Sequence, residues 1–237
     1  MKYDLQAQWL YDTEIDPVSK RLATLLRSKY LGGCVIKPKS LKLAPTPKNI
    51  RDAIASQIRL PPARLDAVSQ YNTKSLNLTV DVTPPCGVSR FPSSVQVTFS
   101  LGQTFAGGPF ANVNDLRDLA LACAKVGPCP WTFVNPRDIN HGARLEVKRT
   151  TDTWAVPAAI EWITVLHQSI VDKMAVDLMK AETVPGVRVG QKGDFRWIIL
   201  TSHPFQANSA DDLRIQEQVA QAIDLPAIHA RFPRPLQ

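Results

Sequence analysis

The segment LNLTVDV, residues 76–82, is the clearest guide to the fold of this chain. Apolar and polar residues alternate along it, which is typical of a β-strand with one buried and one solvated face. The segment VQVTF, residues 95–99, repeats the pattern after a loop that contains Pro84, Pro85 and Gly87. The two segments therefore predict neighbouring antiparallel strands with one wet face.

Helical patterns lie on both sides of these strands. Leu22, Leu25 and Leu26 form an apolar stripe within residues 17–30, and Thr46 is placed to cap the next helix. The other predicted helices span residues 47–58, 63–70, 113–125, 156–182 and 211–223. Further strands are predicted over residues 34–43, 131–134, 144–149 and 195–201, and an extended tail over residues 232–235.

These elements predict an α/β or α+β protein, in which a basic helical N-terminal part is followed by a mixed β-sheet flanked by helices. The change of pattern after Tyr71 divides the chain into two parts. Residues 1–75 are expected to be mainly helical and to contact nucleic acid, and residues 76–237 to form a mixed α/β core with a proline-rich C-terminal tail. One continuous domain is the alternative, because 237 residues suffice for one large domain or two small ones.

Basic residues are concentrated in residues 17–75. This stretch has twelve Lys or Arg and two acidic residues, a net charge of +10 against +7 for the whole chain. Such a local excess favours a polyanionic partner, most often nucleic acid. The residues expected to contact phosphate are Lys20, Arg21, Arg27, Lys29, Lys37, Lys39, Lys42, Lys48 and Arg51. The alternatives are a solvated surface balanced by acids elsewhere, or a basic face that docks an acidic protein partner.

The cysteines and the apolar segments bear on location. The four cysteines form no C-x-x-C pair, and they do not combine with the four histidines at zinc-ligand spacings. We therefore expect reduced thiols and a cytoplasmic protein. The first residues do not resemble a secretory signal, and no run reaches the roughly 18 apolar residues that span a bilayer, so no membrane partner is expected.

One short pattern suggests chemistry. Asp138 precedes a predicted turn at residues 140–142, and Glu146 and Lys148 follow two positions apart on the next predicted strand. Because side chains alternate along a strand, Glu146 and Lys148 share one face. Two carboxylates and a lysine suit the binding of a divalent cation beside a phosphodiester. The alternative is that Glu146 and Lys148 form the solvent-facing side of an ordinary hairpin.

This pattern resembles the PD-(D/E)XK nuclease superfamily over about residues 112–223. The predicted order of helix, hairpin, long helix, strand and helix is similar to the core of that superfamily. The resemblance implies a Mg²⁺-dependent phosphodiesterase in which Asp138, Glu146 and Lys148 are catalytic. Asp138 and Glu146 would hold the metal, with help from Asp118 or Asp115 on the preceding helix, and Lys148 would orient the attacking water.

Two features depart from the superfamily pattern. Arg137 separates Pro136 from Asp138, and the interval between Asp138 and Glu146 is short for two full strands. The sequence thus predicts a nucleic-acid-binding protein, with phosphodiester hydrolysis as one possibility. The alternative is a non-catalytic subunit of a nucleoprotein complex, such as a CRISPR-type effector or a phage particle, with other protein subunits as partners.

Overall fold

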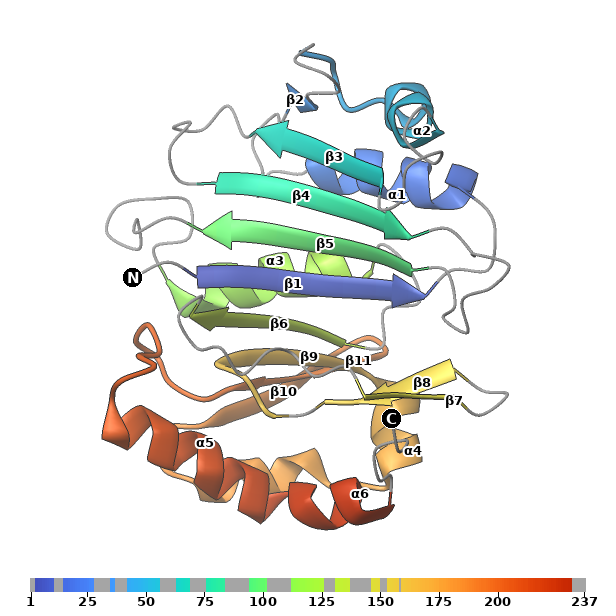
Figure 1. The fold of residues 1–237 in the computed structure, drawn as a ribbon. Helices are drawn as coiled ribbons and strands as arrows, with labels where there is room; N and C mark the ends of the chain where they lie inside the picture. The colour runs from blue at the N-terminus through green and yellow to red at the C-terminus, as the bar shows by residue number, and fades with distance from the viewer. Residues whose placement is uncertain are drawn as a thin grey trace.

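A computed structural model of the chain shows a long antiparallel sheet with helices along one face and at both ends (Figure 1). The structure describes residues 3–10, 15–27, 35–36, 42–55, 63–68, 76–83, 94–101, 112–125, 131–136, 146–149, 153–157 and 159–231. Within these residues, nine strands form one sheet, and every pair of neighbours is antiparallel. Their spatial order is β10 (Arg188–Lys192), β11 (Phe195–Ile199), β9 (Ile163–His167), β6 (Trp131–Pro136), β1 (Tyr3–Leu10), β5 (Ser94–Leu101), β4 (Leu76–Thr83), β3 (Ala63–Val68) and β2 (Val35–Ile36).

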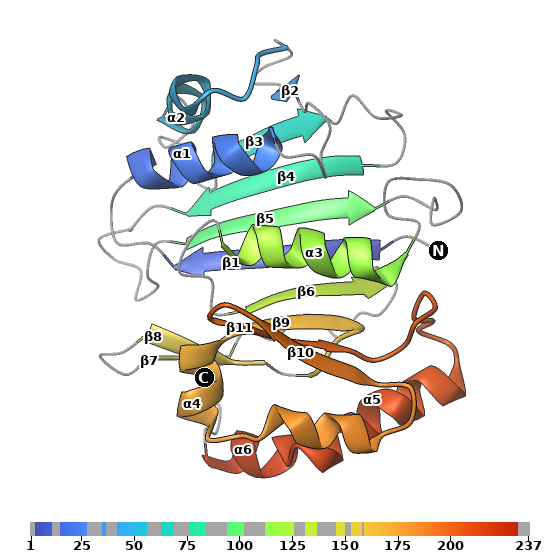
Figure 2. The ribbon, with the colours of Figure 1, turned by 180° about the vertical axis from the view of Figure 1, so that it is seen from behind.

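Helices lie at both ends of this sheet and over its middle strands. They are α1 (Ile15–Leu26), α2 (Pro47–Ala55), α3 (Val113–Ala124), α4 (Gln168–Met174), the 3₁₀ helix η2 (Leu178–Thr183), α5 (Ala210–Ala222) and α6 (Leu225–Arg231). Figure 2 shows α1 and α3 on the same face of the sheet. The helix pair α1–α2 lies at the β2–β3 end, whereas η2 contacts the opposite edge strand, β10, and α5 packs on η2. The mixed α/β class with flanking helices is therefore confirmed.

The predicted strands at the centre of the chain are confirmed. β4 and β5 pair antiparallel, with Leu78 opposite Phe99. The first strand, β1, was not predicted, although Leu5, Ala7 and Trp9 alternate with polar residues. β1 lies between β5 and β6, so the N-terminal residues form a central strand of the sheet. β3 also pairs with β4, so one ladder joins residues on both sides of residue 75.

Helices α1 and α2 follow the predicted periodicity. Leu22, Leu25 and Leu26 are buried, and Ile50 of α2 is fully buried as well. The Oγ1 atom of Thr46 accepts a hydrogen bond from the backbone N–H of Asn49 at 3.1 Å, as expected of an N-cap. Because α1 and α2 pack against each other, these apolar stripes form the helical layer over the β2–β3 end of the sheet.

Two predicted helices are wrong. Residues 63–70 were expected to be helical, but β3 occupies residues 63–68, because pairing with β4 overrides the helix propensity of Ala, Leu and Arg. Residues 156–182 were expected to form one long helix, but they contain β9, α4 and η2. Residues 163–166 are buried on both sides of the sheet, and such an apolar run cannot be distinguished from a buried helix by periodicity.

The predicted hairpin between residues 131–134 and 144–149 is also wrong. β6 pairs with β1 and β9 in the main sheet. β7 (Glu146–Arg149) pairs instead with β8 (Thr153–Val156) in a separate two-stranded ribbon. Nearness in sequence therefore did not determine the partner of β6, because the central strand β1 occupies that edge. The predicted tail, residues 232–235, lies outside the described residues.

Candidate nucleic-acid interface

Six of the nine predicted phosphate-contacting residues lie in the described part of the chain, and all six are exposed. We call them the basic surface: Lys20, Arg21, Arg27, Lys42, Lys48 and Arg51. The other three predicted residues, Lys29, Lys37 and Lys39, lie outside the described residues. The basic surface is formed by α1, α2 and the segment just before α2, and the two helices are in contact.

Helical periodicity places the charges of α1 outward. The apolar stripe faces the interior, so Lys20 and Arg21 emerge on the opposite side of the helix. Arg27 follows nearly two turns later, and its Nε atom donates to the carbonyl oxygen of Ala23 at 3.0 Å. Such a bond at the C-terminal end of a helix orients the guanidinium and satisfies a carbonyl there.

The acids described in this region both contact the same cation. The guanidinium of Arg51 lies 3.7 Å from the Oδ1 atom of Asp16 and 3.3 Å from that of Asp52. Lys20, Lys42 and Lys48 form no ion pair with any described residue. Their charges are therefore compensated only by solvent and counterions within the described part of the chain, which is the condition that attracts a polyanion.

The predicted catalytic residues are not brought into one described site. Asp138 lies outside the described residues. Glu146 and Lys148 belong to β7, opposite Val156 and Trp154 of β8. Their separation of two positions along a strand is confirmed, and their catalytic role stays a prediction.

Asp118, the third predicted metal ligand, already has cationic partners. Its Oδ1 atom accepts from Arg117 Nη2 at 2.9 Å and lies 3.8 Å from Lys192 Nζ. The same Arg117 guanidinium lies over the ring of Trp197, 4.9 Å from its centroid. These contacts tie α3 to β10 and β11. A Mg²⁺ ion at Asp118 would have to compete with both cations, and no metal-binding group of three His, Cys, Asp or Glu occurs among the described residues.

Asp115, the alternative ligand on α3, lies in the first turn of this helix and contacts its N-cap residue, Asn112. The Oδ2 atom of Asp115 accepts from Asn112 Nδ2 at 2.6 Å, and Asn112 Oδ1 accepts from the Asp115 backbone N–H at 3.0 Å. This reciprocal arrangement satisfies donors at the start of α3. The structure thus gives Asp115 and Asp118 structural contacts that explain their presence on this helix.

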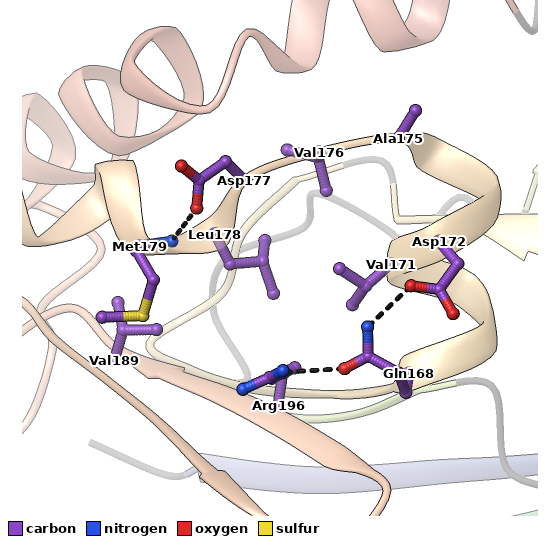
Figure 3. Close-up of a pocket in the computed structure, with 10 residues that line it drawn as sticks. All are labelled: Gln168, Val171, Asp172, Ala175, Val176, Asp177, Leu178, Met179, Val189 and Arg196. Carbon is purple, nitrogen blue, oxygen red and sulfur yellow. Dashed lines mark hydrogen bonds between the residues drawn. The ribbon is translucent and has the colours of Figure 1, made fainter.

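A pocket that was not predicted from the sequence lies at the other end of the sheet. About 410 Å³ in volume, it lies between α4, η2 and strands β10 and β11 (Figure 3). A chain of hydrogen bonds follows one side: Arg196 Nε donates to Gln168 Oε1 at 2.7 Å, and Gln168 Nε2 donates to Asp172 Oδ1 at 2.7 Å. The remaining lining residues are Val171, Ala175, Val176, Asp177, Leu178, Met179 and Val189. No sequence motif marks this pocket, because its walls come from four separate elements.

A buried carboxyl group, that of Glu161, lies in the core between the start of β9 and α5. Glu161 is 6% exposed, and burial raises the pKa of its carboxyl from the ordinary 4.5 to about 7, against the smaller, lowering effect of a hydrogen bond with Gln216. The Gln216 Nε2 atom lies 3.4 Å from Glu161 Oε2 and also donates to the Ile160 carbonyl at 2.8 Å. Glu161 therefore joins the segment just before β9 to α5 through a carboxyl group whose pKa is raised by burial.

An imidazole–carboxylate pair joins the β11–α5 connection. His203 Nε2 lies 3.0 Å from Asp212 Oδ1, and Asp212 Oδ2 accepts from the backbone N–H of Gln206 at 2.8 Å. Asp212 is buried whereas His203 is exposed. A buried carboxylate that orients an exposed imidazole is an arrangement found in general bases, but it also closes this loop onto α5. Sequence spacing alone gave no signal for the pair.

Comparisons with known proteins add information on the fold only. No family model matches the chain, and no curated protein matches it. Among solved structures, the Pseudomonas aeruginosa T6SS protein PA0821 is similar, with a TM-score of 0.56 over 94% of this chain and 72% of that chain. The two sequences are 10% identical, so the likeness concerns the architecture alone. Within the described residues, no helix combines the length and hydropathy needed to cross a membrane.

Proposed function

We propose that this protein binds nucleic acid through the basic surface. The observation that supports the proposal is the exposure of all six residues of the basic surface, on and beside two helices in contact, with the two nearby acids both directed at Arg51. Clustered Lys and Arg bind phosphates with release of counterions, whatever the base sequence. The proposal includes a cytoplasmic setting, which is supported by four scattered cysteines that form no C-x-x-C pair.

The binding is expected to be electrostatic and only weakly sequence-specific. Long lysine side chains on a helical surface contact phosphates as point charges, and they do not read base edges in the way that a bidentate arginine does. The log of the association constant should therefore fall linearly with the log of salt concentration. On duplex DNA, each lost phosphate contact should reduce that slope by about 0.9.

Charge reversal on the basic surface tests the proposal. We would measure the fluorescence anisotropy of labelled single- and double-stranded DNA and RNA with the wild-type chain, with Lys20→Glu/Lys48→Glu, and with a matched control. The control is Lys125→Glu/Lys180→Glu, which reverses two exposed lysines, one at the C-cap of α3 and one in η2. Both variants change the net charge equally, so a difference between them reports the location of the interface.

The expected outcome is a loss of at least roughly tenfold in affinity for the first variant at about 100 mM salt, because two phosphate contacts are lost and two repulsions gained. The control should lose much less. Equal losses in both variants would mean that net charge alone attracts the nucleic acid. Absence of wild-type binding at moderate salt would favour an acidic protein partner for the basic surface.

A second candidate function is Mg²⁺-dependent cleavage of the bound nucleic acid. The observation that favours it is the position of Glu146 and Lys148 on the same face of β7. Glu146→Ala should abolish Mg²⁺-dependent cleavage and leave binding intact, with Glu217→Ala on α5 as the control for removal of an exposed acid. Binding without cleavage in both Mg²⁺ and EDTA would leave the non-catalytic, nucleoprotein-subunit function.

A further inference from the structure

We infer that the pocket between α4 and η2 is a docking site for an extended segment of a protein partner that presents an apolar side chain next to a lysine or arginine. The inference does not depend on nucleic-acid binding, because the pocket and the basic surface lie at opposite ends of the sheet (Figure 1). It rests on the shape of the pocket, on its apolar wall and on two carboxylates that form no ion pair with a described residue.

The apolar part of the pocket suits one inserted side chain. Val171 of α4, Leu178 of η2 and Val189 of β10 are buried residues that face the cavity from three elements (Figure 3). At the rim, Met179 is 51% exposed, a high fraction for a large apolar residue. Flexible methionines beside an open apolar cavity are typical of surfaces that receive side chains from another protein.

The polar part of the pocket favours a cation. Asp172 Oδ1 accepts from Gln168, and Asp177 Oδ1 accepts from the Met179 backbone N–H at 3.0 Å. Neither carboxylate forms an ion pair with a described residue, so each has a second oxygen available. Arg196 does not neutralise them, because its Nε and Nη1 atoms donate to the amide oxygens of Gln168 and Gln191.

Together these features select the occupant. Two carboxylates against one guanidinium give the lining a net negative charge, which repels a phosphate and attracts an ammonium or guanidinium group. An apolar side chain in the cavity would hold a neighbouring lysine or arginine beside Asp172. An extended segment supplies both groups, because residues two apart in a strand-like peptide lie on the same side.

A display experiment can test the inference without a known partner. The probe is a phage-displayed library of random peptides, selected on the full chain. The enriched peptides should combine an apolar residue with Lys or Arg within two positions. A synthetic peptide of the enriched sequence should shift the methyl NMR signals of Val171, Leu178 and Val189, and leave those of Leu22 and Leu26 in α1 unchanged.

Charge variants make the test specific. Asp172→Lys should weaken binding of the synthetic peptide by roughly tenfold or more, and Asp172→Asn by less. Both variants lose the attraction between the Asp172 carboxylate and the cation of the peptide, and Asp172→Lys also introduces a repulsion. Glu217→Lys on α5 makes the same charge change outside the pocket and should have little effect. Equal melting temperatures for the wild-type and variant chains would confirm that Asp172→Lys is folded.

Four outcomes would overturn the inference. The first is a library that yields no enriched peptide, and the second is enrichment of peptides without a basic residue. The third is equal weakening of binding by the two lysine variants, which would indicate general charge attraction. The fourth is peptide binding only to a chain shortened to end at Arg231, which would assign the pocket to the chain's own residues 232–237 and not to a partner.

Discussion

The two ends of the sheet use their charged and polar groups differently. At the α1–α2 end, the described cations are exposed, and Lys20, Lys42 and Lys48 form no ion pair with a described residue. At the β9–α6 end, Glu161 and Asp212 are buried and hydrogen-bonded within the core. The difference indicates that charges at the first end are available to a nucleic acid, whereas the buried polar groups at the second end determine how stable the protein is. Substitutions at the two ends should therefore separate binding from stability.

The largest effect on stability is expected from Trp162→Ala at the β9–α6 end. Trp162 is 1% exposed, and its Nε1 atom donates to the Thr201 carbonyl oxygen at 3.0 Å. Loss of the ring leaves a cavity and an unpaired carbonyl, at a cost of about 3–5 kcal/mol in the free energy of unfolding. Urea unfolding followed by fluorescence and circular dichroism would measure it.

Met179→Ala provides the control for this prediction, since a half-exposed side chain should contribute little. At a temperature where the Trp162→Ala protein remains folded, the affinity of this variant for DNA should equal that of the wild type. A large loss of DNA affinity in the folded variant would contradict the separation of the two ends.

The second prediction concerns the pH dependence of stability. The pKa of Glu161 is about 7 in the folded protein, against an ordinary 4.5. Between these values the folded state holds a proton that the unfolded state has lost, so the contribution of Glu161 to stability decreases as pH rises from about 4.5 to about 7. Glu161→Gln, which keeps an oxygen acceptor for Gln216 Nε2 but cannot ionise, should stabilise the protein at pH 8 by up to about 3 kcal/mol.

Urea unfolding at several pH values tests this prediction. The advantage of Glu161→Gln should disappear near pH 4, where both forms are uncharged. Glu217→Gln, a substitution of an exposed acid on α5, should show no comparable gain. A constant difference between Glu161→Gln and wild type across the whole pH range would mean that ionisation of Glu161 is not the cause.

A smaller effect is expected from Gly190→Ala on β10. A Cβ atom at this position would lie 2.2 Å from Cζ2 of Trp197, the residue paired with it on β11. The ring is also covered by Arg117, so it cannot move away freely. Overpacking of this kind costs about 1–3 kcal/mol. Thermal unfolding would measure the loss. In the double variant Gly190→Ala/Trp197→Ala the clash is absent, so the effects of the two substitutions on stability should not add.

The success of the sequence analysis depended on how each element is buried. Helices α1, α2, α3 and α5 were predictable because one face is apolar and the other is polar, and β4 and β5 because their residues alternate. β9 was mistaken for a helix because Ile163 and Val165 on one side and Thr164 and Leu166 on the other are all buried. Burial on both faces removes the period on which the distinction depends.

The candidate sites follow the same logic. The basic surface was predictable because its cations are local in sequence and lie outside the apolar stripe of α1. The pocket was not, since Gln168 and Arg196 meet only through the pairing of β9 with β11 and the start of α4. The predicted site at Glu146 assumed a hairpin with β6 that does not form, because β1 and β9 are the partners of β6.

The smallest predicted effect returns to the α1–α2 end and asks whether the basic surface depends on the placement of α2. Thr46→Ala removes the Oγ1 acceptor for the Asn49 N–H, which should cost about 1 kcal/mol. Thr24→Ala is a matched control on α1, because its Oγ1 atom only donates back to the Lys20 carbonyl oxygen at 3.1 Å, and alanine is the better helix former.

Hydrogen exchange should be faster in the first turn of α2 in Thr46→Ala and unchanged at the β9–α6 end. If fraying of α2 displaces Lys48, DNA affinity should fall slightly with Thr46→Ala and not with Thr24→Ala. Equal affinities would mean that the lysines bind phosphate independently of the helix start, and faster exchange across the whole sheet would mean that the two ends unfold as one unit.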